Sequence, residues 1–289
     1  MRPTTRLREL LGRPRLLVAP GAWDALSARI VEEAGFEAVY VTGSGVSVGH
    51  LGLPDIGLAT MTEMVEQVRR IAAAVAIPVI ADADTGYGNA LNVRRTVREY
   101  EAAGAAGLHL EDQEFPKRCG HLEGKRVIPA ETMVTRVRAA CEARRDPDLV
   151  IIARTDARAV LGLDEALRRA EAYRAAGADA LFVEAPVGEG EVEAVARALA
   201  GAPLLINLGG AGKTPMLPAP DLQRLGYRIA IYPGDLQKAA IHAMREVARA
   251  LRRDGSTTAL ADRMVSFAER FELVGLTRFR ALEARYRAP

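Results

Sequence analysis

Four stretches of the sequence share one pattern, in which small residues and a glycine lead directly into a short apolar run. They read EEAGFEAVYVTG, EAAGAAGLHLED, RAAGADALFVEA and RLGYRIAIYPG. The glycine is typical of a helix C-cap, and the apolar run after it is typical of a buried strand. A chain that repeats helix, glycine and buried strand is restricted to α/β folds with a parallel sheet.

The same alternation continues along most of the 289 residues and predicts eight strands, near 16–19, 37–42, 77–82, 106–111, 149–154, 179–184, 203–207 and 228–232. Segments of helical period lie between them, such as 61–75 and 164–176. Eight such units predict a (β/α)8 barrel of the TIM type. The alternative is a doubly wound open sheet. It is disfavoured because VAPGAWDA, after the first predicted strand, is no GxGxxG phosphate loop.

We expect the barrel to be one catalytic domain over 1–250, followed by a helical extension over 251–289. In the extension Leu260, Met264, Phe267 and Phe271 fall on one predicted helical face. An apolar face left over after the barrel closes needs a partner. The extension is therefore expected to pack on the barrel or on a partner subunit.

Composition excludes several classes of protein. The 39 basic and 37 acidic residues are dispersed along the chain, which disfavours a nucleic-acid partner. The apolar runs are of strand length and the N-terminus lacks the apolar middle of a signal peptide, so we expect no membrane partner and a cytoplasmic location. Cys119 and Cys141 are too few for a disulfide framework and are expected to be free thiols.

In a barrel the active site lies at the carboxyl ends of the strands, and acidic residues gather there in this sequence. Asp82, Asp84 and Glu111 follow the third and fourth predicted strands, and Asp55 in LGLPDIG can join them. Such an all-oxygen cluster suits Mg²⁺ or Mn²⁺ with retained waters. The alternative is that these acids are helix N-caps and surface loop residues. Acids on neighbouring strands favour the metal site.

Two further strand ends carry groups that bind anions. Thr42, Gly43 and Ser44 offer backbone N–H groups that can hold a carboxylate, although an ordinary strand-to-loop turn is the alternative. Arg154 can clamp a carboxylate or steady a developing enolate. Its alternative is a structural pair with Asp156 or Glu184.

Cys119 lies in FPKRCGHLEGK, within a predicted connection over 112–129 that is long enough to be a lid or binding loop. Lys117, Arg118 and His121 would lower the pKa of the thiol, which could then exchange a proton near neutral pH. A role for Cys119 as a nucleophile is disfavoured because no oxyanion partner is evident beside it, and a zinc site would lack sufficient ligands. An inert loop thiol remains the alternative. No role is assigned to Cys141, or to the histidines His50, His109 and His242, which are interpreted as structural.

The blocks VAPGAWDALSARI, IADADTGYG, HLEDQ, FPKRCGH and RTDAR together resemble the isocitrate lyase and phosphoenolpyruvate mutase superfamily, in its methylisocitrate lyase and 2,3-dimethylmalate lyase branch. The likeness covers most of residues 15–250. It implies a (β/α)8 barrel whose eighth helix swaps between subunits of a homotetramer, a dimer of dimers. It also implies Mg²⁺-dependent retro-aldol cleavage of a 2-hydroxy acid, a small-molecule carboxylate.

The resemblance also implies roles for individual residues. Asp84 would be the direct metal ligand, while Asp82, Asp55 and Glu111 would act mostly through waters. Cys119 would protonate the carbanion, with His121 beside it. Tyr40 would lie near the scissile alcohol, and Arg154 and Glu184 would steady the charge. The substrate would contact Thr42, Gly43, Ser44, Gly120 and Asn207.

Alternatives remain open within and outside this superfamily. Phosphonate mutases and oxaloacetate decarboxylases lack the loop cysteine, whereas oxaloacetate hydrolases have a similar loop and remain a rival. The segment NLGGAGKTP from Asn207 lacks the side chains that hold a third carboxylate, which favours a 2-alkylmalate or 2,3-dimethylmalate over 2-methylisocitrate. A class II aldolase would need histidine ligands, and the intact strand-end residues disfavour a non-catalytic binding protein.

Overall fold

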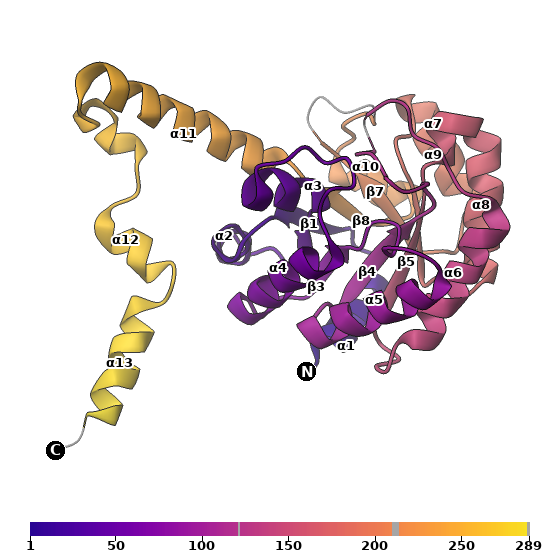
Figure 1. The fold of residues 1–289 in the computed structure, drawn as a ribbon, viewed down its shortest axis with the longest axis horizontal. Helices are drawn as coiled ribbons and strands as arrows, with labels where there is room; N and C mark the ends of the chain where they lie inside the picture. Colours follow the sequence, from indigo (N-terminus) through magenta and orange to yellow (C-terminus); the bar gives the residue numbers. More distant parts are fainter. Residues whose placement is uncertain (121, 210–213, 288–289) are drawn as a thin grey trace. The chain divides into compact units, whose positions relative to one another are not determined.

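The protein is described by a computed structural model that covers residues 1–120, 122–209 and 214–287. Eight parallel strands close into a barrel in sequence order, with β8 pairing β1. The strands lie at the centre of the barrel and helices surround them (Figure 1). Their bounds are β1 (Leu17–Ala22), β2 (Val39–Val41), β3 (Val79–Asp82), β4 (Gly107–Glu111), β5 (Val150–Thr155), β6 (Ala180–Val183), β7 (Leu204–Asn207) and β8 (Tyr227–Tyr232). The predicted barrel is confirmed, and the open sheet is excluded.

Helices precede the barrel and follow its strands. Their bounds are α1 (Pro3–Gly12), α2 (Ala25–Glu33), α3 (Gly43–Val46), the π-helix η1 (Ser47–Leu51), α4 (Met61–Ala74), α5 (Ala90–Ala103), α6 (Ala130–Ala143), α7 (Ala157–Leu161), α8 (Leu163–Ala175), α9 (Gly188–Ala198) and α10 (Ala219–Leu225). The connection from β4 to α6 is the long loop expected from the sequence.

Local signals explain where helices begin and where strands follow. Thr60 and Asn89 form capping boxes at the starts of α4 and α5. Gly104 ends α5 with a left-handed φ of 98°, and a Cβ there would lie 2.9 Å from that of Ala72. The chain turns at this glycine directly into β4, which is the predicted helix–glycine–strand pattern.

One end of the barrel is closed by apolar side chains. Leu7 and Leu10 of α1 are buried in the same cluster as interior-facing residues such as Ile80, Ile152 and Ile229. A second cluster joins the outer faces of the strands to the surrounding helices. Packing therefore fills the interior, and polar side chains collect at the carboxyl ends of the strands.

The chain divides into two compact units, Met1–Leu236 and Gln237–Pro289. The remaining helices are α11 (Asp235–Asp254), the 3₁₀ helix η2 (Thr258–Arg263), α12 (Phe267–Glu272) and α13 (Leu276–Tyr286). The expected single helical face through 260–271 is wrong, because Ser266 forms a capping box with Glu269 and starts a new helix. Within the described residues, no helix has the length and apolar character needed to cross a membrane.

A core substitution in the barrel tests this packing. Leu108 in β4 is fully buried, so Leu108→Ala is expected to lower the free energy of unfolding by about 3 kcal/mol through lost contacts and a residual cavity. Leu91 in α5 is 74% exposed, and Leu91→Ala serves as the control with little change. Urea titration measures both; equal midpoints for the two variants would contradict the assigned strand packing.

Candidate active site

Buried carboxylates from two segments surround one ammonium group. Lys117 Nζ lies 2.6 Å from Asp55 Oδ1 and 2.6 Å from Asp84 Oδ1, with all three side chains less than a tenth exposed. Asp82 lies beside them at the end of β3, where its Oδ1 accepts the backbone N–H of Asp84 at 2.9 Å. The structure thus brings together acids that the sequence placed at one barrel end.

The electrostatics of this cluster favour additional positive charge. Burial, together with neighbouring Asp82 and Asp55, raises the pKa of Asp84 to about 6 despite the opposing effect of Lys117. Burial alone would lower the pKa of Lys117, but the acids around it raise that pKa well above its usual value. The carboxylates therefore share an ammonium that stays charged at neutral pH.

Arg154, at the end of β5, lies among a second set of acids. Its Nε and Nη2 donate to Asp156 at 2.9 and 3.1 Å, so the expected alternative of a structural pair is present. Its Nε also lies 3.3 Å from Glu111, and its Nη1 lies 3.8 Å from Glu184. Because Asp156 is bound along one edge, the guanidinium is fixed in a single orientation while still facing Glu111 and Glu184.

His109 is a site residue that the sequence analysis missed. It is fully buried in β4, with Nε2 2.8 Å from the hydroxyl of Tyr40 and 3.5 Å from Asp82 Oδ1. Burial lowers the pKa of His109 to about 4, so its imidazole is neutral at pH 7. The signal for it was period-2 alternation, which places His109 and Glu111 on the same face of β4.

The loop between β4 and α6 lies against the Arg154 cluster. A Cβ added at Gly120 would lie 2.3 Å from Glu184 Oε1 and 2.7 Å from Arg154 Nη2, so this backbone touches both residues. The neighbouring Cys119 is partly buried, and its N–H donates to the carbonyl of Asp55 at 3.1 Å. His121, the other predicted catalytic group of the loop, lies outside the described residues.

The other predicted site residues flank these clusters. Gly43 donates its N–H to Asp82 Oδ2 at 3.3 Å, and Thr42 caps the short helix α3, which contains Ser44. Asn207 donates to Glu184 Oε1 at 3.2 Å. Part of the segment expected to select the substrate, residues 210–213, is not among the described residues.

The structure also bears on the two cysteines and on the predicted metal site. Cys141 is a partly buried free thiol whose Sγ lies 3.1 Å from the carbonyl of Gly177, which agrees with a packing role. Cys119 and Cys141 are not joined by a disulfide. Across residues 1–120, 122–209 and 214–287, no three Asp, Glu, His or Cys side chains form a group that could ligate one ion directly.

A barrel whose strand ends hold buried acids and a fixed arginine, with a cysteine on the adjoining loop, is typical of an enzyme that acts on a small molecule. The family model described as phosphoenolpyruvate phosphomutase matches residues 7–252. The chain is 48% identical to 2,3-dimethylmalate lyase of Eubacterium barkeri, covering 99% of both proteins. It is 45% identical to a probable 2-methylisocitrate lyase of Corynebacterium glutamicum, covering 97% of this chain and 92% of that protein.

Solved structures of similar proteins share the fold of this chain. The crystal structure of 2,3-dimethylmalate lyase matches with a TM-score of 0.93 at 40% identity, covering 99% of this chain and 95% of that one. Oxaloacetate acetylhydrolase with difluorooxaloacetate matches with a TM-score of 0.93 at 38% identity, covering 98% and 96%. Phosphonopyruvate hydrolase with oxalate and Mg²⁺ matches with a TM-score of 0.89 at 38% identity, covering 99% of both.

The chain belongs to the phosphoenolpyruvate mutase and isocitrate lyase superfamily. It is a carbon–carbon lyase, the class named for its relatives at 48% and 45% identity.

The buried neutral imidazole predicts a pH dependence of stability. The folded protein holds fewer protons on His109 than the unfolded chain between about pH 4 and 6.5, so stability falls as pH falls through this window. The loss is on the order of 3 kcal/mol. Urea midpoints of wild type and His109→Gln, measured from pH 7 to 4, isolate this contribution, since other titrating groups are shared. Parallel curves for the two proteins would show that His109 is not buried in neutral form.

Proposed function

We propose that this enzyme cleaves a 2-hydroxy dicarboxylate of the 2-alkylmalate or 2,3-dimethylmalate type by a Mg²⁺-dependent retro-aldol reaction. The products are a 2-oxoacid such as pyruvate and a smaller carboxylate. The observation that carries the proposal is the loop backbone at Cys119 and Gly120, which lies on Arg154, Glu184 and Asp55 at the carboxyl end of the barrel. The backbone that carries the Cys119 thiol thus lies beside charged groups able to hold an anionic substrate, which supports its proposed role as a proton donor.

The residues present fit a magnesium ion held through one carboxylate and several waters. Asp55 and Asp84 share the Lys117 ammonium, Asp82 accepts the backbone N–H of Asp84 beside them, and the buried Glu111 Oε1 has no hydrogen-bond partner among the described residues. Mg²⁺ and Mn²⁺ prefer such oxygen donors, and Mg²⁺ commonly keeps several waters. We assign Asp84 as the direct ligand and Asp82, Asp55 and Glu111 as groups that bind the waters. When bound, the ion polarises the oxygen of the nascent oxo group.

Neighbouring side chains and backbone groups orient the substrate. The segment Thr42, Gly43 and Ser44 lines the 2-oxoacid end, because it begins the short helix α3 beside Asp82, to which the Gly43 N–H donates. Asn207 and Gly120, which both contact Glu184, bound the other side. Arg154 balances the charge of the substrate carboxylates.

The reaction consists of one bond cleavage and two proton transfers. The proton of the substrate hydroxyl goes to the Tyr40–His109 pair, whose imidazole is neutral and can accept it. The bond between the hydroxyl-bearing carbon and its neighbour breaks, forming the oxo group and leaving an electron pair on the neighbouring carbon. The Cys119 thiol, assisted by His121 two residues further along the sequence, protonates that carbon. The covering loop excludes water, so the carbanion meets this proton donor first.

Replacing the proton donor tests the proposal. Cys119→Ser is expected to reduce kcat by about 10²- to 10⁴-fold because a serine hydroxyl is a far weaker acid. A lactate-dehydrogenase-coupled assay measures the 2-oxoacid formed, which is pyruvate, 2-oxobutyrate or glyoxylate, with Mg²⁺ and 2,3-dimethylmalate, 2-ethylmalate, 2-methylisocitrate, isocitrate or oxaloacetate. Cys141→Ser is the matched control and keeps wild-type activity.

The same panel separates the rival activities. Cleavage of 2-methylisocitrate in preference to the malates would move the substrate to the tricarboxylate class, which the relative in Corynebacterium glutamicum is named for. Consumption of oxaloacetate alone would replace the lyase by a decarboxylase if pyruvate forms, or by a hydrolase if oxalate and acetate form, and these two products are measured by NMR. Near-normal turnover by Cys119→Ser would remove Cys119 as the proton donor.

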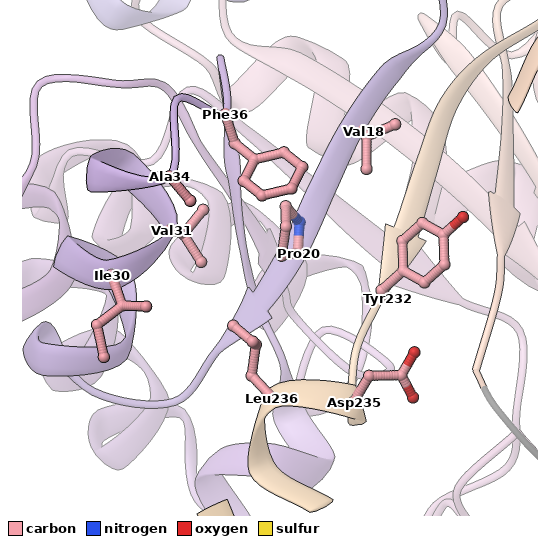
Figure 2. Close-up of a pocket in the computed structure, with 9 residues that line it drawn as sticks. All are labelled: Val18, Pro20, Ile30, Val31, Ala34, Phe36, Tyr232, Asp235 and Leu236. Carbon is pink, nitrogen blue, oxygen red and sulfur yellow. The ribbon is translucent and has the colours of Figure 1, made fainter. Parts of the chain in front are cut away.

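We also propose that the eighth helix is exchanged between subunits of a homotetramer. An apolar groove of about 280 Å³ lies beside β1, β8 and α2, where the eighth helix of a barrel packs (Figure 2). Its lining includes Val18, Ile30, Phe36 and Leu236. In α11, Met244 and Leu251 lie at helical spacing and are 61% and 50% exposed. The exposed apolar side chains of α11 from a second copy are suited to fill this apolar groove.

A charge in the groove tests the exchange. Ile30→Asp is expected to shift the protein from tetramer to a smaller species, because an unpaired carboxylate would be buried under the incoming helix. Light scattering coupled to size-exclusion chromatography measures the mass. Leu91→Asp, on the exposed face of α5, is the control. A wild-type mass for Ile30→Asp, or a monomeric wild type, would contradict the exchange.

A further inference from the structure

The loop that carries Cys119 has a paired stem. The N–H of Glu114 donates to the carbonyl of Arg126 at 2.9 Å, the N–H of Ile128 donates to that of Asp112 at 2.9 Å, and Gln113 bridges to Val127. These bonds hold the two arms of the loop together near β4. They leave the position of the tip, at Cys119 and Gly120, to other contacts.

Lys125 is placed to fix the tip. It lies at the end of the stem that adjoins the tip, next to Arg126, and its side chain is 2% exposed. Its ammonium donates to the carbonyl of Gly120 at 2.5 Å and to Asp156 Oδ1 at 2.9 Å. The first bond attaches to the residue that follows Cys119, and the second attaches to the barrel.

Asp156 is a rigid acceptor for this lysine. Its backbone N–H donates to Asp112 Oδ1 at 2.8 Å. The other oxygen of Asp112 accepts from Thr155, Tyr173 and Arg169 at 2.7, 2.8 and 3.0 Å. All four of these hydrogen bonds are buried, so Asp156 has little freedom to follow a moving loop.

Asp156 also binds Arg154 through two hydrogen bonds. One carboxylate therefore fixes both the arginine that faces Glu111 and Glu184 and the lysine that holds the loop tip. A buried ammonium is unfavourable without acceptors, so Lys125 keeps Gly120 in place as long as the loop is closed.

We propose that Lys125 is a positioning residue that holds Cys119 over the site by linking the Gly120 carbonyl to Asp156. Because Asp156 also binds Arg154, this link fixes the position of the loop tip relative to Arg154. Its effect on turnover rests on the proposed role of Cys119 as proton donor. The competing interpretation is a buried ion pair that stabilises the barrel without governing the loop.

Limited trypsin digestion of the whole protein distinguishes the two without any substrate. Lys125→Met keeps the length of the side chain and removes its ammonium, so the Gly120 carbonyl loses its link to Asp156 and cleavage after Arg118 is expected to rise roughly tenfold or more. Arg126→Met is the matched control, because Arg126 is exposed and pairs with Glu114 on the stem surface. Mass spectrometry identifies the cleaved bond, and urea midpoints report the global stability.

Cleavage after Arg118 at the wild-type rate in Lys125→Met would overturn the proposal. So would cleavage that rises at many sites in proportion to a lowered urea midpoint, since that indicates a purely structural pair. Tip-specific cleavage with an unchanged Arg126→Met control supports it.

The second readout is kcat and KM, measured with a substrate of the panel that the wild-type enzyme cleaves. A misplaced proton donor lowers kcat, so Lys125→Met is expected to lose about 10- to 100-fold in kcat with a smaller change in KM. A loss confined to KM would overturn the positioning role. If no substrate is cleaved by wild type, the proposed function fails, and the digestion still decides whether Lys125 holds the loop.

Discussion

The carboxylates at the carboxyl end of the barrel can remain buried only because cations neutralise them. Arg154 comes from the barrel itself, whereas Lys117 and Lys125 come from the loop between β4 and α6. The loop therefore completes the charge balance of the site at the same time as it brings Cys119 and Gly120 onto it. The proposed substrate binding and proton donation therefore depend on one electrostatic constraint, since moving the loop would uncover acids that burial alone disfavours.

The fold was predictable because its signals are local and repeated. A glycine such as Gly104 ends a helix and leads into a buried strand; four stretches show this pattern, and the alternation of helical and strand segments extends it to eight units without knowledge of tertiary contacts. The acids were predictable for a related reason, since the ends of parallel strands meet at one rim. The helical extension was predicted less well, because a single cap at Ser266 outweighed the apolar periodicity around it.

The site residues that could not be predicted from the sequence are those whose side chains contact residues of other strands or loops. His109 reads as an ordinary strand residue until the barrel closes and places it between Tyr40 and Asp82. Lys125 reads as a surface loop charge, yet it is buried against Asp156, which is distant in the sequence. The pairing of Lys117 with Asp55 and Asp84 is likewise set by tertiary structure, while its effect on the Cys119 thiol stays a prediction.

The central claim is that the enzyme breaks a carbon–carbon bond and that a group fixed in the protein protonates the resulting carbanion. Cleavage of 2,3-dimethylmalate in D₂O, with NMR and chiral analysis of the products, tests it most directly. Protonation by a fixed group should give pyruvate together with propionate that carries one deuterium at C2 in a single configuration. Racemic C2 deuteration, or pyruvate formed without propionate, would contradict it.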